Sequence, residues 1–349
     1  MSRTRSPRIA ILADDLTSAA DGASPFVERG LAAKVGRSAL PEGASQVVAV
    51  DVGSRSLDAS CAATRMTRFA EELRAADILI KTVDSTLRGH VRLEIAVALR
   101  GSGRSRLVFA PAFPAAGRTT QKGVQLVEGV PVDRSAYARD PVHPVRTALL
   151  AELVPHDIAE AVLLDARDQD ALDRQVGDIA RPEEVLWAGS PGLSHALAKR
   201  FGTRPHAAPL PAIDPILVVV GSANPISHRQ ADMLRGCDGI TVLTVPRTPS
   251  ERPPSLLAAL ADEAADAITR GSFGALFATG GDTMDAVLDR LAVRQFDLLG
   301  ELEPGVPFGA AQIGGRTLVL GMKAGGFGDE RTLRRLADRL TQQTEDLPS

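Results

Sequence analysis

The chain has 349 residues, more than one hydrophobic core normally organises, so we expect two domains. Hydrophobic residues make up 44% of it and charged residues 24%, a balance that excludes an intrinsically disordered chain. The net charge of -3, without a basic tail and with 3% aromatic residues, argues against nucleic acid as a partner. Cys61 and Cys237 lie far apart, so we expect neither a disulfide framework nor a zinc site, as in a reducing cytoplasm.

The N-terminal segment does not have the pattern of a secretion signal. Its apolar run, residues 9–13, is short and ends at Asp14 and Asp15. No later stretch is long enough to span a bilayer. We therefore expect a cytoplasmic protein that has no membrane partner.

Short apolar runs alternate with longer helical stretches along the first part of the chain. This alternation is typical of an α/β domain with a mostly parallel sheet and helices on its faces. The runs are residues 9–13, 47–50, 78–80, 107–110 and 162–164, and the helical stretches include residues 61–75 and 171–179.

Residues 204–215 carry four prolines and have the composition of a linker between domains. Three further apolar runs follow at residues 216–220, 275–278 and 318–320. We therefore predict two α/β domains, residues 1–207 and 213–349. Each should be a mostly parallel sheet flanked by helices, with the active site in the cleft between them.

Polar clusters follow the first two strands, at the strand ends where open parallel sheets bind ligands. Asp14 and Asp15 end the first run, and Thr17 can cap the helix that follows. The simpler interpretation is that one carboxylate caps the helix and the other is solvated. Arg55 follows the second strand, where a surface arginine is the default unless other strand ends converge on it.

The densest cluster follows the run at residues 78–80. An arginine there can bind a carboxylate in a bidentate fork, and Asp84 can accept a proton from a hydroxyl. The alternative is an Asx turn with solvated charges, but a turn seldom needs so many different polar groups. A proline- and glycine-containing loop after the next strand can direct Arg118 inward. The cluster consists of Lys81, Asp84, Ser85, Thr86 and Arg88.

In the second domain, glycines follow three strands. Glycines permit close approach of backbone N–H groups to a phosphate, and a helix N-terminus favours an anion. Thr283 can cap the helix that follows the second of these strands. An ordinary glycine-rich turn is the alternative. The chain has neither a Walker A motif nor a dinucleotide-binding fingerprint. The candidate phosphate ligands are Ser222, Gly280, Gly281, Asp282, Thr283, Lys323, Gly325 and Gly326.

Taken in order, these clusters resemble the four-carbon acid sugar kinase family. The resemblance is carried by residues 13–17, 81–89, 111–119, 221–222, 280–283 and 323–328. It implies an N-terminal domain that binds the acid sugar and a C-terminal domain that binds ATP. It also implies transfer to the 4-hydroxyl of a four-carbon acid sugar. D-threonate is the first candidate, followed by D-erythronate, L-threonate and 3-oxo-tetronate.

The resemblance places Asp14, Arg55 and residues 81–88 at the substrate, and Ser222, residues 280–283 and Gly325 at ATP. For phosphoryl transfer we also expect Mg²⁺ to bridge the phosphates. Asp84, Asp14 or Asp15 accepts the proton of the attacking hydroxyl, and the metal ligands are left unassigned. Three features depart from the family pattern. Ser18 and Ala324 stand where the family commonly has glycine and serine, and the chain is short.

Two other classes of function are compatible with an α/β chain. A nucleotide-dependent oxidoreductase needs a dinucleotide fingerprint, which this sequence does not have. A non-catalytic sensor of acid sugars would bind substrate without releasing ADP, and the density of charged groups at the strand ends disfavours it. A homo-oligomer is compatible with all of these functions.

Overall fold

The computed structural model describes residues 8–140, 143–203, 213–222, 224–247 and 254–341. The chain forms two compact units, Met1–His206 and Ala207–Ser349. The predicted linker falls largely on residues 204–212, outside the described residues. Among the described residues, no helix is both long and apolar enough to cross a membrane.

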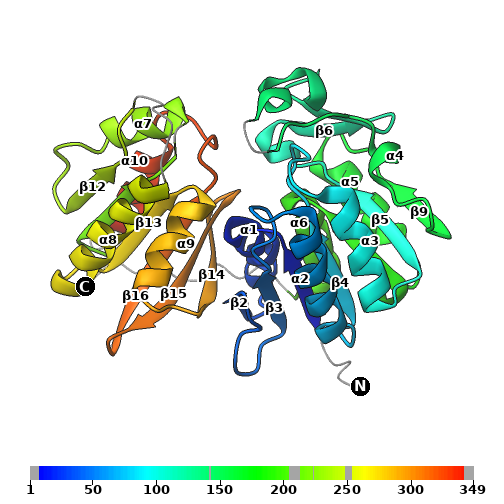
Figure 1. The fold of residues 1–349 in the computed structure, drawn as a ribbon, viewed down its shortest axis with the longest axis horizontal. Helices are drawn as coiled ribbons and strands as arrows, with labels where there is room; N and C mark the ends of the chain where they lie inside the picture. The colour runs from blue at the N-terminus through cyan, green and yellow to red at the C-terminus, as the bar shows by residue number, and fades with distance from the viewer. Residues whose placement is uncertain (1–7, 141–142, 204–212, 223, 248–253, 342–349) are drawn as a thin grey trace, which may run out of the picture. The chain divides into compact units, whose positions relative to one another are not determined.

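The first unit is built on a parallel sheet (Figure 1). Its strand order is β2-β3-β1-β4-β10-β5-β9. The five predicted strands are confirmed, and the sequence pattern missed β2 and β10. The strands are β1 (Ile9–Ala13), β2 (Ala33–Arg37), β3 (Val47–Asp51), β4 (Ile78–Thr82), β5 (Arg106–Ala110), β9 (Glu160–Leu163) and β10 (Val185–Gly189).

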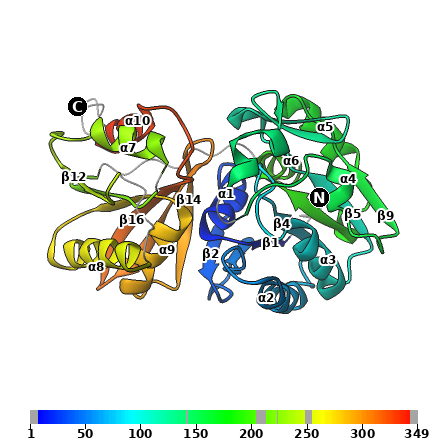
Figure 2. The same cartoon turned by 45° about the horizontal axis from the view of Figure 1, so that its top comes forward.

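Helices cover both faces of this sheet (Figure 2). On one face α1 (Leu16–Val27) packs against α6 (Pro191–Phe201), which packs against α5 (Gln169–Asp178). On the other face α2 (Ala59–Glu72) packs against α3 (Val91–Ser102). The loop after β1 therefore leaves toward one face, and the loops after β3 and β4 leave toward the other. In open parallel sheets, ligands bind at the carboxyl ends of the strands where successive loops divide in this way.

The central strands are buried on both faces, which is why they read as continuous apolar runs. Every residue of β1 is at most 2% exposed. The expectation that Thr17 caps α1 is wrong, because Asp15 is the N-cap and its Oδ1 accepts a hydrogen bond from Ser18 N at 2.7 Å. Asp15, two residues after the end of β1, thus begins α1 as its N-cap.

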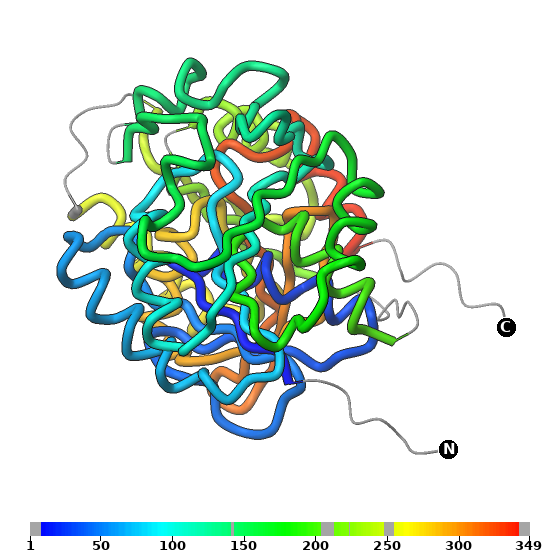
Figure 3. Tube along the Cα trace, turned by 90° about the vertical axis from the view of Figure 1, so that its right-hand side faces the viewer, coloured from blue at the N-terminus to red at the C-terminus, as the bar shows by residue number. Residues whose placement is uncertain are grey.

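A small antiparallel sheet lies between β5 and β9 in the chain, and the sequence pattern did not predict it. It consists of β6 (Arg118–Gln121), β7 (Val124–Val127) and β8 (Val130–Pro131), followed by the 3₁₀ turns η2 (Val132–Arg134) and η3 (Ala136–Arg139). In Figure 3 this segment is the teal to green run at the top. Three more short elements complete the unit: η1 (Pro114–Ala116), α4 (Leu150–Leu153) and η4 (Pro182–Glu184).

The second unit has four parallel strands extended by an antiparallel pair among its described residues, in the order β12-β11-β13-β16-β15-β14. Helices α8 and α9 pack together, and α7 contacts α10 (Figure 2). Both units are therefore α/β with mostly parallel sheets, as predicted. The strands are β11 (Ile216–Val220), β12 (Ile240–Thr244), β13 (Ala275–Thr279), β14 (Gln295–Glu303), β15 (Val306–Ile313) and β16 (Arg316–Lys323). The helices are α7 (Pro225–Asp232), α8 (Pro254–Arg270), α9 (Gly281–Arg290) and α10 (Thr332–Thr341).

The core of the first unit should be sensitive to cavities at its central strand. Leu12 is 0% exposed in β1, so Leu12→Ala should lower the free energy of unfolding by about 2–5 kcal/mol. Leu149→Ala is the control, because Leu149 is 47% exposed and its truncation should cost at most about 0.5 kcal/mol. Urea titration followed by the fluorescence of Trp187 measures both, since this single tryptophan is buried in β10. Equal losses for the two variants would contradict the prediction.

Candidate active site

Arg55 joins the ends of β1 and β3 through a compact ion-pair cluster. Its Nε and Nη2 donate to Asp14 at 2.6 and 3.0 Å, and its Nη1 donates to Asp15. Nη2 also donates to Ser18 Oγ at 3.1 Å. Since Asp14 is 3% exposed, the ion pair is desolvated and depends on this geometry. The first two predicted clusters are therefore one structure.

The two adjacent carboxylates titrate in opposite directions. Burial favours the neutral acid of Asp14, but the charges of Arg55 and Lys81 outweigh it and hold its pKa below the ordinary value. Burial raises the pKa of Asp15, and Arg55 only partly offsets it because Asp14 adds a like charge. Of this pair, Asp15 therefore has the higher affinity for a proton.

The loop after β4 is folded around Asp84. Its Oδ1 accepts from Thr86 N at 3.1 Å, and its Oδ2 accepts from Thr86 Oγ1 at 2.9 Å and from Arg88 Nε. Burial would raise the pKa of Asp84, but the charges of Arg88 and Arg55 and these hydrogen bonds hold it well below the ordinary value. The Asx turn that was the alternative interpretation is present, and it organises the charged groups around it.

This loop closes on the first cluster at a glycine. Gly89 has a φ of +93°, and a Cβ built on it would lie 3.2 Å from Asp14 Oδ2. A glycine is therefore needed where the loop passes the carboxylate. Lys81, Asp84 and Arg88 thus lie at the same edge of the sheet as Asp14 and Arg55.

Lys81 does not face solvent. Its side chain is 2% exposed, and its Nζ lies 2.9 Å from Glu94 Oε2 and donates to the carbonyl of Thr82. Ser54 Oγ donates to Glu94 Oε1, so one buried carboxylate of α3 ties the end of β4 to the loop that carries Arg55. The sequence suggested that Lys81 binds substrate. Its contacts are instead those of a buried residue that holds the surrounding loops in place.

The segment that follows the small antiparallel sheet brings further groups to the two outer arginines. Arg88 lies over the ring of Tyr137 at 5.4 Å, and its Nη1 is 3.5 Å from Asp140. Arg118 donates to Tyr137 Oη at 3.3 Å. His143 Nε2 lies 2.5 Å from the carbonyl oxygen of Arg55. Tyr137 therefore connects both predicted arginines, and it is the only tyrosine of the chain.

In the second unit the three glycine-containing loops meet one another. A Cβ on Gly221 would lie 2.2 Å from Thr283 Oγ1, and one on Gly325 would lie 2.0 Å from Ser222 Oγ. Gly280 N donates to the carbonyl of Lys323 at 2.8 Å. The expectation that Thr283 caps α9 is wrong, because Gly280 is the N-cap, with a φ of +96°. Thr283 instead contacts the neighbouring loop.

Metal ligands are sparse at these loops. Among the residues that the structure describes, no group of three His, Cys, Asp or Glu side chains gathers as for a metal ion. Asp282, in the first turn of α9, is the carboxylate of the three glycine loops. Mg²⁺ in phosphoryl-transfer enzymes is commonly held by one or two carboxylates together with the phosphates, and Asp282 fits such a role.

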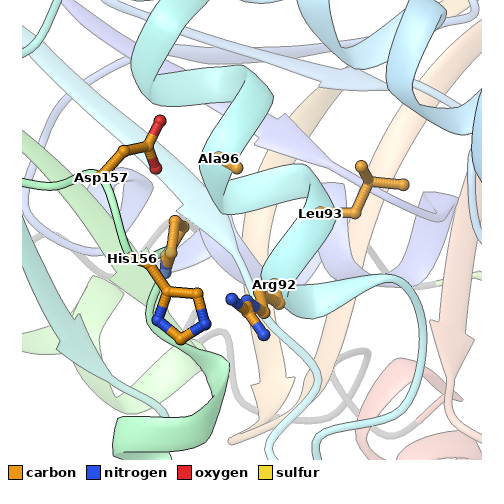
Figure 4. Close-up of a pocket in the computed structure, with 6 residues that line it drawn as sticks. Arg92, Leu93, Ala96, His156 and Asp157 are labelled. Atoms are coloured by element: carbon orange, nitrogen blue, oxygen red, sulfur yellow. The ribbon is translucent and has the colours of Figure 1, made fainter.

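A pocket of about 480 Å³ lies elsewhere, on the outer face of α3 (Figure 4). None of the predicted site residues lines it. The side chains of Arg92 and His156 lie beside each other there, and both residues are exposed. The lining residues are Arg92, Leu93, Ala96, Pro155, His156 and Asp157.

Two family models match the chain. The Sugar-binding N-terminal domain matches residues 9–184, and the Nucleotide-binding C-terminal domain matches residues 247–333. The D-threonate kinase of Bordetella bronchiseptica is 31% identical, with 97% of this chain and 98% of that protein covered. The D-threonate kinase of Cupriavidus necator is also 31% identical, with 95% and 98% covered. The chain belongs to the four-carbon acid sugar kinase family.

A solved structure from Salmonella typhimurium LT2 has the same fold as this family member. Its TM-score is 0.77 at 19% identity, with 94% of this chain and 98% of that chain covered. The alignment with the Bordetella kinase spans 409 positions, although this chain has 349 residues, so the relative contains segments that this kinase lacks. The short length that the sequence suggested is therefore confirmed.

The pattern of the sequence missed several residues of the candidate site. Glu94 is the acidic residue of the otherwise largely apolar helix α3, and an acid on a buried helix face is a usable signal. Tyr137 and Asp140 lie in short turns without periodicity, so only the structure places them beside Arg88. Ser54 precedes Arg55 and gives no signal of its own.

Replacing one member of the Lys81–Glu94 pair should lower the stability of the protein far more than replacing both. Lys81→Met leaves Glu94 as a buried, unpaired charge and should lower the free energy of unfolding by about 3–5 kcal/mol. The double variant Lys81→Met/Glu94→Gln should recover a large part of this loss. Urea titration followed by Trp187 fluorescence measures all three proteins, and a double variant less stable than the single one would refute this account.

Asp21 should make stability depend on pH. Its Oδ1 is buried and has no partner among the described residues. Burial, together with the charge of Asp15, raises its pKa well above the ordinary value of 3.8. Between these two pKa values the folded state binds more protons than the unfolded state, so this group destabilises the protein progressively as pH rises.

Asp21→Asn should therefore leave stability nearly unchanged at pH 4 and raise it by roughly 1 kcal/mol at pH 8. Urea midpoints at the two pH values give the difference. Asp58→Asn serves as the control, since Asp58 is an exposed N-cap and asparagine caps equally well. A gain for Asp21→Asn that is the same at both pH values would speak against a titrating carboxyl.

Proposed function

We propose that the protein phosphorylates the 4-hydroxyl of D-threonate with ATP. The observation that carries this proposal is the cluster of ion pairs after β1, β3 and β4, in which Arg55 and Arg88 hold Asp14, Asp15 and Asp84. A four-carbon sugar acid has several hydroxyl donors and one carboxylate. An ionised carboxylate only accepts hydrogen bonds and a guanidinium only donates them, so this cluster has groups that complement both the hydroxyls and the carboxylate of such a ligand. The 31% identity to D-threonate kinases supports D-threonate as the substrate.

In this proposal the first unit binds the acid sugar. Asp14 and Asp84 accept hydrogen bonds from its hydroxyls, and Ser85 and Thr86 line the same loop. Arg88 and Arg118 bind the substrate carboxylate, because Arg55 is already committed to Asp14 and Asp15. Arg88 retains 30% exposure of its side chain and is therefore within reach of a ligand.

The second unit binds ATP in this proposal. Backbone N–H groups of the loops at residues 280–283 and 324–328 contact the phosphates, and the N-terminus of α9 adds a favourable dipole. Ser222 contacts the nucleotide from the loop after β11. Asp282 is the carboxylate that would hold Mg²⁺, and the bound ion would supply neutralisation of phosphate charge.

The substrate hydroxyl oxygen attacks the γ-phosphorus, a new P–O bond forms, the bond to the bridging oxygen breaks, and ADP leaves. Phosphoryl transfer depends mainly on positioning and on neutralisation of charge. The proton of the hydroxyl goes to a carboxylate. We assign this role to Asp15, whose raised pKa makes it a better acceptor than Asp14 or Asp84. Domain closure, a cytoplasmic location and a homo-oligomer stay predictions.

An assay of ADP release tests the substrate. The purified protein should release ADP with Mg²⁺, ATP and D-threonate, and more slowly with D-erythronate, L-threonate or 3-oxo-tetronate. Phosphate on the terminal hydroxyl is checked by NMR of the product. A protein that is silent on the whole panel, or that is fastest with another acid, would overturn the substrate assignment.

Asp84→Asn should lower kcat/KM for the acid sugar by about 100-fold or more, because the charge that holds Arg88 and accepts a substrate hydroxyl is lost. Asp77→Asn is the matched control, since Asp77 lies at the opposite end of β4 and is exposed. Steady-state kinetics on both folded variants measures the effect. Activity of Asp84→Asn close to that of wild type would remove Asp84 from the site.

A further inference from the structure

Lys323 ends β16 and is fully buried beneath the glycine loop that follows it. Its Nζ donates to the carbonyl oxygens of Ala324 and Phe327 at 3.0 Å each, and to that of Gly325 at 3.4 Å. The side chain thus turns back under its own loop. No carboxylate lies within ion-pair distance of it among the described residues, and burial lowers its pKa to about 7.

Two buried side chains of α7 also donate to carbonyls of this loop. Ser227 Oγ donates to the carbonyl of Gly325 at 2.5 Å. Gln230 Nε2 donates to the carbonyls of Phe327 and Asp329 at 3.1 and 2.6 Å. Both residues are 0% exposed. The loop is therefore anchored by a set of internal donors, and its carbonyls point toward the core.

The direction of these carbonyls determines the direction of the amides. In a planar trans peptide, the C=O of one residue and the N–H of the next point in opposite directions. The inward carbonyls of residues 324, 325 and 327 therefore turn the N–H groups of Gly325, Gly326 and Gly328 away from Lys323. Each of these amides belongs to a glycine, so no Cβ shields it. Consecutive N–H groups of this kind form a concave site for an anion.

We propose that Lys323 is a positioning residue for nucleotide binding. It holds the loop so that the N–H groups of Gly325, Gly326 and Gly328 form a cradle for a phosphate of ATP. Lys323 acts through the peptide groups and does not contact the phosphate, unlike the lysine ligand that the sequence suggested. Ser227 and Gln230 share this role. The inference rests on the proposed nucleotide function of the second unit.

Direct binding of nucleotide separates this inference from the reaction itself. Titration calorimetry with the non-hydrolysable analogue AMP-PNP and Mg²⁺ should show a Kd raised about tenfold or more in Lys323→Met, since the carbonyls of Ala324 and Phe327 lose the charged donor that they share. The Kd for D-threonate should stay within about twofold of wild type. In turnover, the KM for ATP should rise while the KM for the acid sugar does not.

Lys199→Met is the matched control, because Lys199 lies in the first unit with 52% of its side chain exposed, and it should bind AMP-PNP like wild type. Ser227→Ala and Gln230→Leu each remove one set of internal donors and should weaken AMP-PNP about threefold or more. These two variants decide the matter if Lys323→Met does not fold. Wild-type affinity in a folded Lys323→Met, or in both α7 variants, overturns the role of the internal donors. Absence of nucleotide binding by wild type overturns the proposed function and the cradle together.

Discussion

The ion pair between Arg55 and the two carboxylates after β1 is the constraint on which the first unit depends. Asp14 and Asp15 lie at the buried end of a central strand, where two like charges cannot both be kept without a cation. Arg55 supplies that cation from the neighbouring strand and thereby fixes the relative position of the two loops. The same requirement recurs one strand further, where Glu94 compensates Lys81.

These internal ion pairs determine which cations remain available to a ligand. Arg55 and Lys81 are occupied within the protein, so the proposed function assigns the acidic end of the ligand to the outer arginines, Arg88 and Arg118. These two are joined by Tyr137, which lies in η3 after the small antiparallel sheet. The second unit follows the same principle with backbone groups, because internal donors occupy the carbonyls of its glycine loop and leave amides for the ligand. In both units, buried polar groups hold in position the polar groups that lie nearer the surface.

Much of the fold was predictable from the sequence, because strands buried on both faces leave unbroken apolar runs and the loops after them collect polar residues. The sequence therefore indicated that Asp14, Arg55 and Asp84 belong to one edge of a sheet. It could not indicate which cations are buried, since Lys81 and Lys323 look like surface lysines until Glu94 and the carbonyls around them are seen. The sequence also predicted the wrong N-caps. Asp15 caps α1 in place of Thr17, and Gly280 is the N-cap of α9 in place of Thr283, because aspartate and glycine are also favoured at N-cap positions.

The distribution of the two free cysteines has a practical consequence. Cys61 lies exposed at the start of α2 in the first unit, and Cys237 is partly exposed in the second. Each unit of the wild-type chain therefore carries one thiol and no other. A pair of spin labels attached to these thiols would report the separation of the two units in solution, with and without ligands, in a protein that needs no engineered cysteine. The natural sequence thus allows the distance between the two units to be measured directly.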